Sequence, residues 1–176
     1  MIMVSRRTEP ASPIRRHPSI VPFSRDHHFG LLLSWKIRQG IKNHIDGERI
    51  SDYVIYFFEK ALAPHFRLEE EQLFPLFAEG HAGCQQALRE HTQLEFLVNE
   101  LRRDKTGNVI LQAFADLLEK HIRFEERILF NQLQTEIYDP HITEDRSQHL
   151  TKEEDPDLNW EDHFWTASPE KRRRNK

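Results

Sequence analysis

One stretch of this sequence occurs twice. The ten residues 65–74 (HFRLEEEQLF) return 56 positions later as residues 121–130 (HIRFEERILF), with six identical positions and no gap. A repeat of this kind indicates two helices that do the same work in one fold. In each copy the histidine and the first glutamate are four residues apart, so on a helix they lie on one face. An imidazole and a carboxylate on one face form half of a metal site, and two such helices facing each other complete it.

Apolar residues at a spacing of three to four predict four amphipathic helices. Their expected ranges are 24–41, 51–75, 84–103 and 109–137. Pro22 is expected to prevent helix before Ser24, and Ser24 and Ser51 to cap the first two helices. Pro64 lies inside the second helix, where it removes a hydrogen bond and kinks the backbone at a cost of about 3 kcal/mol. Four such helices with short links predict an all-α fold, an up-down-up-down four-helix bundle.

The 176 residues suit one domain with two tails. Residues 1–23 form an extended, Arg/Pro-rich N-terminal segment, residues 24–138 the bundle, and residues 139–176 a charged C-terminal tail that is expected to be flexible. Three aromatic residues in this tail are unusual for a solvated segment: Trp160, Phe164 and Trp165. They predict that the tail docks either onto the bundle or onto a protein partner.

Composition excludes several classes of protein. The net charge of −4 gives no case for nucleic-acid binding, and no apolar run approaches the roughly 20 residues of a membrane span. The N-terminus has no apolar h-region, so it does not resemble a secretory signal. The single cysteine, Cys84, rules out an internal disulfide and agrees with a cytoplasmic location.

Histidine followed four residues later by glutamate is a weak motif alone, and it occurs five times in this chain. The pairs His44/Glu48 and His149/Glu153 fall in a predicted loop and in the polar tail, so they are set aside. The other three pairs are His65/Glu69, His91/Glu95 and His121/Glu125. The predicted inner faces of the last two helices hold Cys84, Leu88, His91, Glu95 and Val98, then Phe114, Leu117, Leu118, His121, Glu125 and Ile128. A buried carboxylate is costly unless it is paired or binds a metal, which favours ligands over exposed pairs.

Two positions stay open at this stage. Glu95 is either a ligand or an ordinary outward-facing glutamate. The first predicted helix offers His27 and His28, which are adjacent and therefore about 100° apart, so only one can face the interior. The helical wheel slightly favours His27, which falls among Leu31 and other inward residues.

These residues resemble the hemerythrin-like, or HHE cation-binding, domains. The resemblance covers about residues 20–138 and rests on motifs from all four helices, in order: Arg25-Asp26-His27-His28, Pro64-His65-Phe66 through Glu69 to Pro75, Glu90-His91, and His121 through Glu125 to Phe130. It implies a non-haem di-iron centre inside the bundle. The implied terminal ligands are His65, His91, His121 and one of His27 and His28, with Glu69 and Glu125 as bridging carboxylates. The oxygen carriers of this family have a second histidine where this chain has Glu95, which implies a more anionic site.

The resemblance implies a protein that binds or senses dioxygen, nitric oxide or peroxide, or that handles iron. Imidazole and carboxylate also suit manganese and zinc, but iron is the favoured metal, and Cys84 alone cannot supply a usual structural zinc site. Partners are therefore expected to be a small diatomic ligand or peroxide, with no nucleic acid and no membrane. Two alternatives stay open: a di-iron enzyme of stress response that consumes peroxide or repairs iron centres, and a metal-free helical interaction module.

Overall fold

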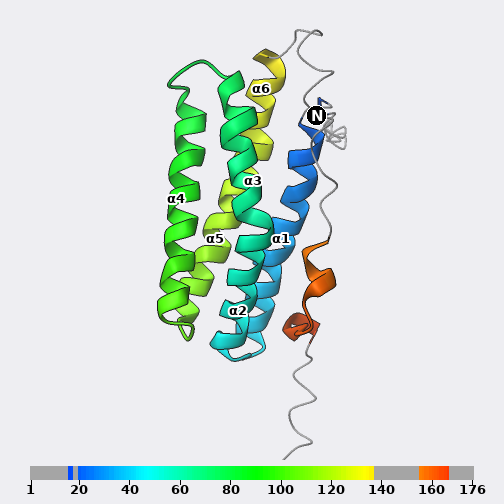
Figure 1. Cartoon of the computed structure of the whole chain (residues 1–176), viewed down its shortest axis with the longest axis vertical. Helices are drawn as coiled ribbons and strands as arrows, with labels where there is room; N and C mark the ends of the chain where they lie inside the picture. Colours follow the sequence, from blue (N-terminus) through cyan, green and yellow to red (C-terminus); the bar gives the residue numbers. More distant parts are fainter. Residues whose placement is uncertain (1–15, 18–19, 137–154, 167–176) are drawn as a thin grey trace, which may run out of the picture.

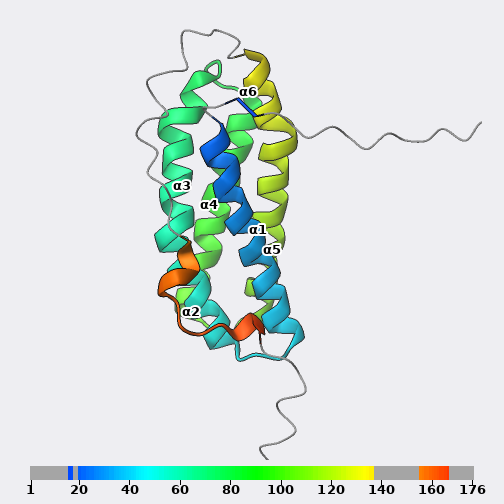
Figure 2. The same ribbon diagram turned by 90° about the vertical axis from the view of Figure 1, so that its right-hand side faces the viewer.

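A computed structural model describes residues 16–17, 20–136 and 155–166, and in these ranges it contains helices and no strand. Four long helical rods run antiparallel, side by side (Figures 1 and 2). The first is α1 (Val21–Lys42), and the third is α4 (Ala82–Arg103). The second is built from α2 (Gly47–Phe57), η1 (Phe58–Leu62), α3 (Ala63–Leu68), η2 (Glu69–Leu73) and η3 (Phe74–Leu76). The fourth is built from α5 (Asn108–Phe124), η4 (Glu125–Leu129) and α6 (Phe130–Glu136).

Each rod packs against its neighbours in the chain, and the first also packs against the last. Contacts join α1 to α2, α2 to α4, α4 to α5, and α5 back to α1. This cyclic order confirms the predicted all-α, up-down-up-down four-helix bundle. No described helix is long and apolar enough to cross a membrane.

The starts of the first two helices differ from the predictions. The first helix begins at Val21, with Pro22 in its first turn, where a proline has no hydrogen bond to lose. Ser24 is therefore not the N-cap. The second begins at Gly47, because the side chain of Asp46 accepts a hydrogen bond from the backbone N–H of Glu48 and caps it in place of Ser51.

Pro64 lies where the second rod is irregular, as predicted. The π-helical segment η1 (Phe58–Leu62) ends two residues before it, and α3 then begins with the proline in its first turn. The wider turn lies where the proline lacks its N–H, so the rod continues through this position.

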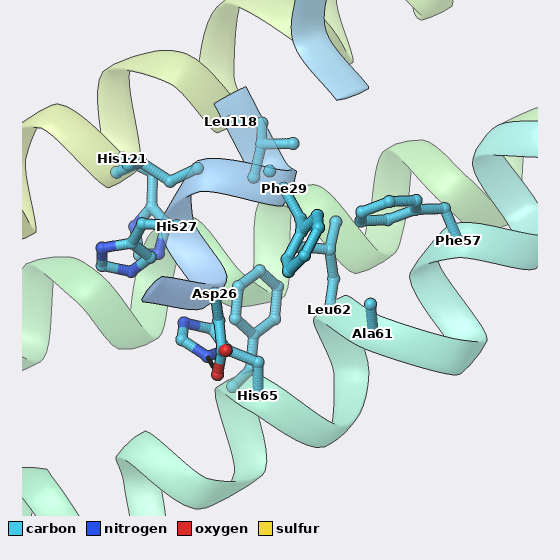
Figure 3. Close-up of a pocket in the computed structure, with 12 residues that line it drawn as sticks. Asp26, His27, Phe29, Phe57, Ala61, Leu62, His65, Leu118 and His121 are labelled. Carbon is cyan, nitrogen blue, oxygen red and sulfur yellow. Dashed lines mark hydrogen bonds and ion pairs between the residues drawn. The ribbon is translucent and has the colours of Figure 1, made fainter. Parts of the chain in front are cut away.

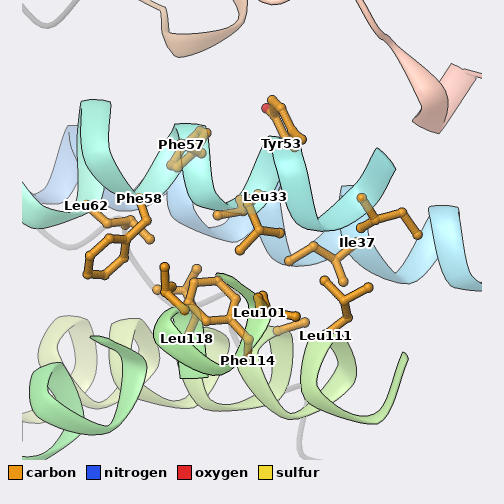
Figure 4. Close-up of a cluster of buried hydrophobic side chains, with 14 of the residues drawn as sticks. Leu33, Ile37, Tyr53, Phe57, Phe58, Leu62, Leu101, Leu111, Phe114 and Leu118 are labelled. Carbon is orange, nitrogen blue, oxygen red and sulfur yellow. The ribbon is translucent and has the colours of Figure 1, made fainter. Parts of the chain in front are cut away.

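The core consists of two hydrophobic clusters that lie one above the other along the bundle. The larger contains Leu33, Ile37, Phe57, Leu62, Leu101, Leu111, Phe114 and Leu118, among others (Figure 4). The smaller contains Ile20, Phe23, Leu73, Phe74, Phe77, Cys84, Ala87, Leu129, Phe130 and Leu133. Along α1 and α4 the predicted ligands follow the smaller cluster and precede the larger one, and along α5 the order is reversed. The predicted site therefore lies in the layer between two apolar clusters.

Three residues predicted to face inward are exposed instead. They are Leu88, Glu95 and Ile128. The inner face of α4 is held by Ala87, Leu94 and Leu101, which are completely buried. Cys84, His91 and Val98 are buried as predicted, but the positions that complete this face lie three residues after them and not four, so Leu88 and Glu95 point outward.

Part of the C-terminal tail packs against the bundle. Residues 155–166, with the short turns η6 (Pro156–Asn159) and η7 (Phe164–Thr166), lie along the outside of α1 and α2 (Figure 2). Phe164 is buried, and Trp160 and Trp165 pack against the larger cluster. The expected boundaries at residues 23 and 138 stay predictions, since most of both tails lies outside the described residues. Within 155–166, the expected flexibility gives way to docking onto the bundle.

Candidate metal centre

Four buried histidines, one from each rod, point their Nε2 atoms at two buried glutamates. His27 comes from α1, His65 from α3, His91 from α4 and His121 from α5, and each has at most 5% of its surface exposed. Glu69 and Glu125 are completely buried at the centre. The pairs that the repeat predicts are formed: His65 Nε2 lies 3.2 Å from Glu69 Oε1, and His121 Nε2 lies 3.3 Å from Glu125 Oε2.

The other two histidines close the cluster from the opposite rods. His27 Nε2 lies 3.1 Å from Glu125 Oε2 and 3.6 Å from Glu69 Oε1. His91 Nε2 lies 3.4 Å from Glu69 Oε2 and 3.1 Å from His121 Nε2. The two oxygens of Glu69 therefore face different histidines: Oε1 faces His27 and His65, and Oε2 faces His91.

These six residues form two overlapping groups, each compact enough to surround a cation. One group is His27, His65 and Glu69, and the other is Glu69, His91, His121 and Glu125; within each, the ligand atoms lie within 4.8 Å of one another. Glu69 belongs to both groups. A carboxylate has two oxygens, so this one residue can offer a ligand atom to each group.

Several buried polar atoms at this centre have no hydrogen-bond partner within the described part of the protein. They are His27 Nε2, His65 Nε2 and both carboxylate oxygens of Glu69 and Glu125. Buried polar groups are normally hydrogen-bonded, and an unpartnered buried carboxylate is costly. Imidazole nitrogen and carboxylate oxygen are good ligands for iron, manganese and zinc, so the donor set fits a cation at this position.

Each of the four histidines also has a carboxylate on its outer nitrogen, Nδ1. The Nδ1–carboxylate pairs are His27–Glu126 at 2.8 Å, His65–Asp26 at 3.3 Å, His91–Glu70 at 2.8 Å and His121–Glu90 at 3.0 Å. With Nδ1–H donated outward, the neutral imidazole keeps the lone pair of Nε2 directed at the centre. This is the tautomer that a metal ligand requires.

Both copies of the repeat contain the same backbone irregularity. The π-helical segments η2 and η4 begin at Glu69 and Glu125 themselves. π-Helical turns are rare and frequently lie at functional sites. The repeat thus duplicates the ligand pair together with the wide turn that follows it.

In the metal-free protein, the opposite charges of the histidines and the carboxylates around them stabilise one another. Burial opposes a charge on His65, but Glu69 and Asp26 outweigh it and raise the pKa of His65 to about 9. Burial likewise disfavours an ionised Glu126, yet hydrogen bonds from His27 and Arg16 lower the pKa of this carboxyl to about 2. The pKa values of His27 and His91 are also raised, because neighbouring carboxylates outweigh burial, so protons on these three histidines balance the carboxylates in the metal-free protein.

The structure brings together His27, His65, Glu69, His91, His121 and Glu125 from the predicted set. His28 lies outside the cluster and is exposed, with its ring against that of Phe29. Glu95 is exposed on α4. His44 and His163 are exposed, and His81 caps α4 by accepting a hydrogen bond from the N–H of Cys84. His141 and His149 lie outside the described residues.

The sequence reasoning missed the four outer carboxylates. A signal for two of them was present, because Glu70 and Glu126 are identical positions of the repeat, each directly after a central glutamate. Asp26 and Glu90 directly precede His27 and His91. Their pairing with histidines of other rods depends on the packing of the bundle, which a linear motif does not contain.

A small cavity lies directly against the centre. Asp26, His27, His65 and His121 line one side of it, and Phe29, Phe57, Ala61 and Leu62 line another (Figure 3). Its volume is about 10 Å³, which is near the lower limit for one water molecule. Gly30 lets α1 approach α5 here, since a Cβ atom would come within 2.6 Å of Ile122 Cδ1. The centre thus has a small, mainly apolar chamber beside it.

A four-helix bundle with a buried centre of histidines and carboxylates defines a class of metal-binding proteins. A family model described as the hemerythrin HHE cation-binding domain matches residues 30–133. The chain belongs to this family, and its buried cluster fits a metal-binding role. His27 lies just before the matched span and joins the cluster through the structure. Neither a search of curated proteins nor one of solved structures gave a match.

Proposed function

We propose that this protein is a non-haem di-iron protein that binds or senses dioxygen, nitric oxide or peroxide, or handles iron. The observation that carries the proposal is the set of unpartnered buried atoms on His27, His65, Glu69 and Glu125. Their arrangement in two groups that share Glu69 supports two ions instead of one. The four histidines and Glu125 would complete the ligand sets, with Glu69 and Glu125 as the bridging carboxylates.

The chamber beside the centre supports a very small ligand. Its volume of about 10 Å³, near the lower limit for one water molecule, leaves no room for a larger substrate, and its lining is mainly apolar. The apolar clusters above and below the centre keep bulk water out. Iron, when bound, supplies the redox chemistry and the coordination position at which such a ligand binds.

The protein's own residues position and insulate the centre. His27 and His65, which belong to the centre, also line the chamber, so a ligand there meets that side of the cluster. Asp26 lines the same chamber and pairs with His65 Nδ1, which places a polar group next to the apolar space. Phe66 also lines the chamber and stacks on the ring of His91, at 3.9 Å between centroids.

The test is the metal content and visible spectrum of protein produced with iron. About two irons per chain, with near-ultraviolet absorption that changes on adding dithionite, azide or nitric oxide, is the expected result. Gly30→Ala is a sharper test of the chamber, because its Cβ would collide with Ile122 and reduce the space. It should weaken nitric oxide binding while iron content stays near two.

Other outcomes select the alternatives. Steady consumption of peroxide or nitric oxide would favour an enzyme of stress response. Iron-free, colourless protein with full helix content would contradict the proposal and favour a metal-free interaction module. Zinc or manganese bound in place of iron would retain the site and remove the redox function.

A further inference from the structure

The four outer carboxylates follow one rule. The residue before the histidine on α1 or α4 holds a histidine of the repeat: Asp26 holds His65, and Glu90 holds His121. The residue after the central glutamate of each repeat holds a histidine of α4 or α1. Glu70 thus holds His91, and Glu126 holds His27. Exchanging the first rod with the third and the second with the fourth therefore reproduces all four contacts, which is an approximate two-fold relation.

These four contacts connect the rods around the centre. None of the four carboxylates holds a histidine of its own rod, so each contact ties two rods together. Three of the four contacts measure 2.8–3.0 Å, within the ordinary hydrogen-bond range. A histidine fixed at Nδ1 cannot rotate its Nε2 away from the centre.

Two of the outer carboxylates are themselves fixed. Arg16 donates to Glu126 Oε2 at 2.7 Å and also to the carbonyl oxygen of Glu126. Gln86 donates to Glu90 Oε1 at 3.1 Å, and Lys120 lies 3.4 Å from the same oxygen. The Glu126 side chain is 26% exposed and that of Glu70 is 40% exposed. Of the two outer glutamates in the repeat, Glu126, which holds His27, is thus more rigid and less hydrated than Glu70, which holds His91.

We propose that Asp26, Glu70, Glu90 and Glu126 are positioning residues that orient the four histidines and favour the more highly charged state of the bound metal. This inference rests on the proposed metal centre and deepens it. A carboxylate on Nδ1 makes the imidazole a stronger donor at Nε2. Its negative charge, in surroundings of low polarity, stabilises a trivalent ion more than a divalent one.

The experiment compares Glu126→Gln and Glu70→Gln with Glu71→Gln, an exposed carboxylate next to Glu70 that is matched in chemistry. Zinc affinity is measured by competition with a chelator, and the midpoint potential by titration of the iron-loaded protein. Removing an outer partner typically weakens metal binding by about 10- to 100-fold. Glu126→Gln should approach the upper value, Glu70→Gln should be smaller because its side chain is more hydrated, and Glu71→Gln should be unchanged.

The midpoint potential distinguishes a positioning role of the outer carboxylates from a purely structural one. Loss of a negative charge near the ions should move the midpoint potential to more positive values in Glu126→Gln and Glu70→Gln. Glu126→Asp keeps the charge and should fall between wild type and Glu126→Gln in both measurements. Helix content by circular dichroism should stay at the wild-type level throughout.

Zinc affinities and potentials of both glutamine variants equal to those of Glu71→Gln would overturn the inference and leave the metal centre intact. If the wild type binds zinc but not iron, the iron assignment fails, and the zinc affinities still decide the inference. A wild-type chain that holds neither metal would overturn both.

Discussion

Two buried polar clusters lie in this bundle, and they differ in how their charges are satisfied. The metal centre contains six side chains between the two apolar clusters, and both oxygens of Glu69 and of Glu125 lack a hydrogen bond there. The second cluster joins Lys36, Tyr53 and Asp157 beneath the docked tail. There the Lys36 ammonium donates to the Tyr53 hydroxyl at 2.8 Å and to Asp157, and the Tyr53 hydroxyl donates to Asp157.

The second cluster is complete without a ligand. Lys36 Nζ also lies 4.2 Å from the centre of the Trp165 ring, a cation–π distance. Burial lowers the pKa of Lys36, and the Asp157 carboxylate opposes this shift. The polar groups of the second cluster satisfy one another and fasten the tail to the bundle. The metal centre leaves its inner atoms without hydrogen bonds, which suits a ligand that is not part of the chain.

The largest effects are expected at Glu69, because it belongs to both ligand groups. Glu69→Ala should abolish binding of both ions, while Glu125→Ala leaves His27, His65 and Glu69 in place and should retain part of the metal. His65→Ala and His121→Ala should each lose metal and lower the melting temperature, because a buried glutamate loses the imidazole beside it.

Metal analysis of the purified variants measures this effect. Glu95→Ala is the control, since Glu95 is exposed on α4 and its loss should leave the metal content unchanged. Equal metal content in the wild type and in all four ligand variants would contradict the assignment of these ligands.

The pH dependence of the metal-free protein provides the next contrast. The folded-state pKa of His65 is about 9, above its ordinary value of 6.5, so its charged form stabilises the fold. This contribution is fully present below pH 6.5 and is lost as the pH rises to about 9. The metal-free protein should therefore melt at a lower temperature at pH 9 than at pH 6.5.

The metal-loaded protein should not show this loss, because a metal binds the neutral imidazole and replaces the proton. Bound metal at 1,000 times its dissociation constant adds about 4 kcal/mol to the free energy of unfolding. Thermal melts of both forms at the two pH values test the prediction. A metal-free protein that melts identically at pH 6.5 and pH 9 would contradict it.

These clusters also differ in how far the sequence predicts them. The repeat shows His65, Glu69, His121 and Glu125 directly, since both members of each pair lie on one helix. The bundle follows from the same periodicity. A choice between His27 and its neighbour needs the exact rotation of α1, which a helical wheel indicates only weakly. In the structure the His27 ring is buried and the His28 ring is exposed.

Contacts between distant segments are beyond such reasoning. Lys36 becomes buried because Asp157, 121 residues later, folds back over it. A lysine in an amphipathic helix normally predicts an exposed face. The aromatic residues of the tail indicated that it docks, but their binding surface around Tyr53 is created only when the bundle forms.

Asp157→Ala tests whether the second cluster stabilises the fold independently of the metal centre. It leaves the buried Lys36 ammonium without its carboxylate, and breaking a buried pair destabilises a protein by roughly 3–5 kcal/mol. The Asp157 side chain is 22% exposed, so the lower end of this range, about 3 kcal/mol, is expected. Glu161→Ala, an exposed residue of the same segment, is the control. Chemical denaturation should show this loss while the metal content stays at the wild-type level; loss of metal would mean that the two clusters are coupled.

The smallest effect is expected at the edge of the docked tail. Arg49 donates two hydrogen bonds to Asp162, at 2.6 and 2.8 Å, but both side chains are more than a third exposed. Exposed ion pairs contribute about 0–1 kcal/mol, so Arg49→Ala should cost less than 1 kcal/mol and the loss should shrink in high salt. Denaturation at low and high salt measures this. A loss as large as that of Asp157→Ala would mean that exposed ion pairs fasten the tail to the bundle. The burial of Lys36 would then result from docking and would not drive it.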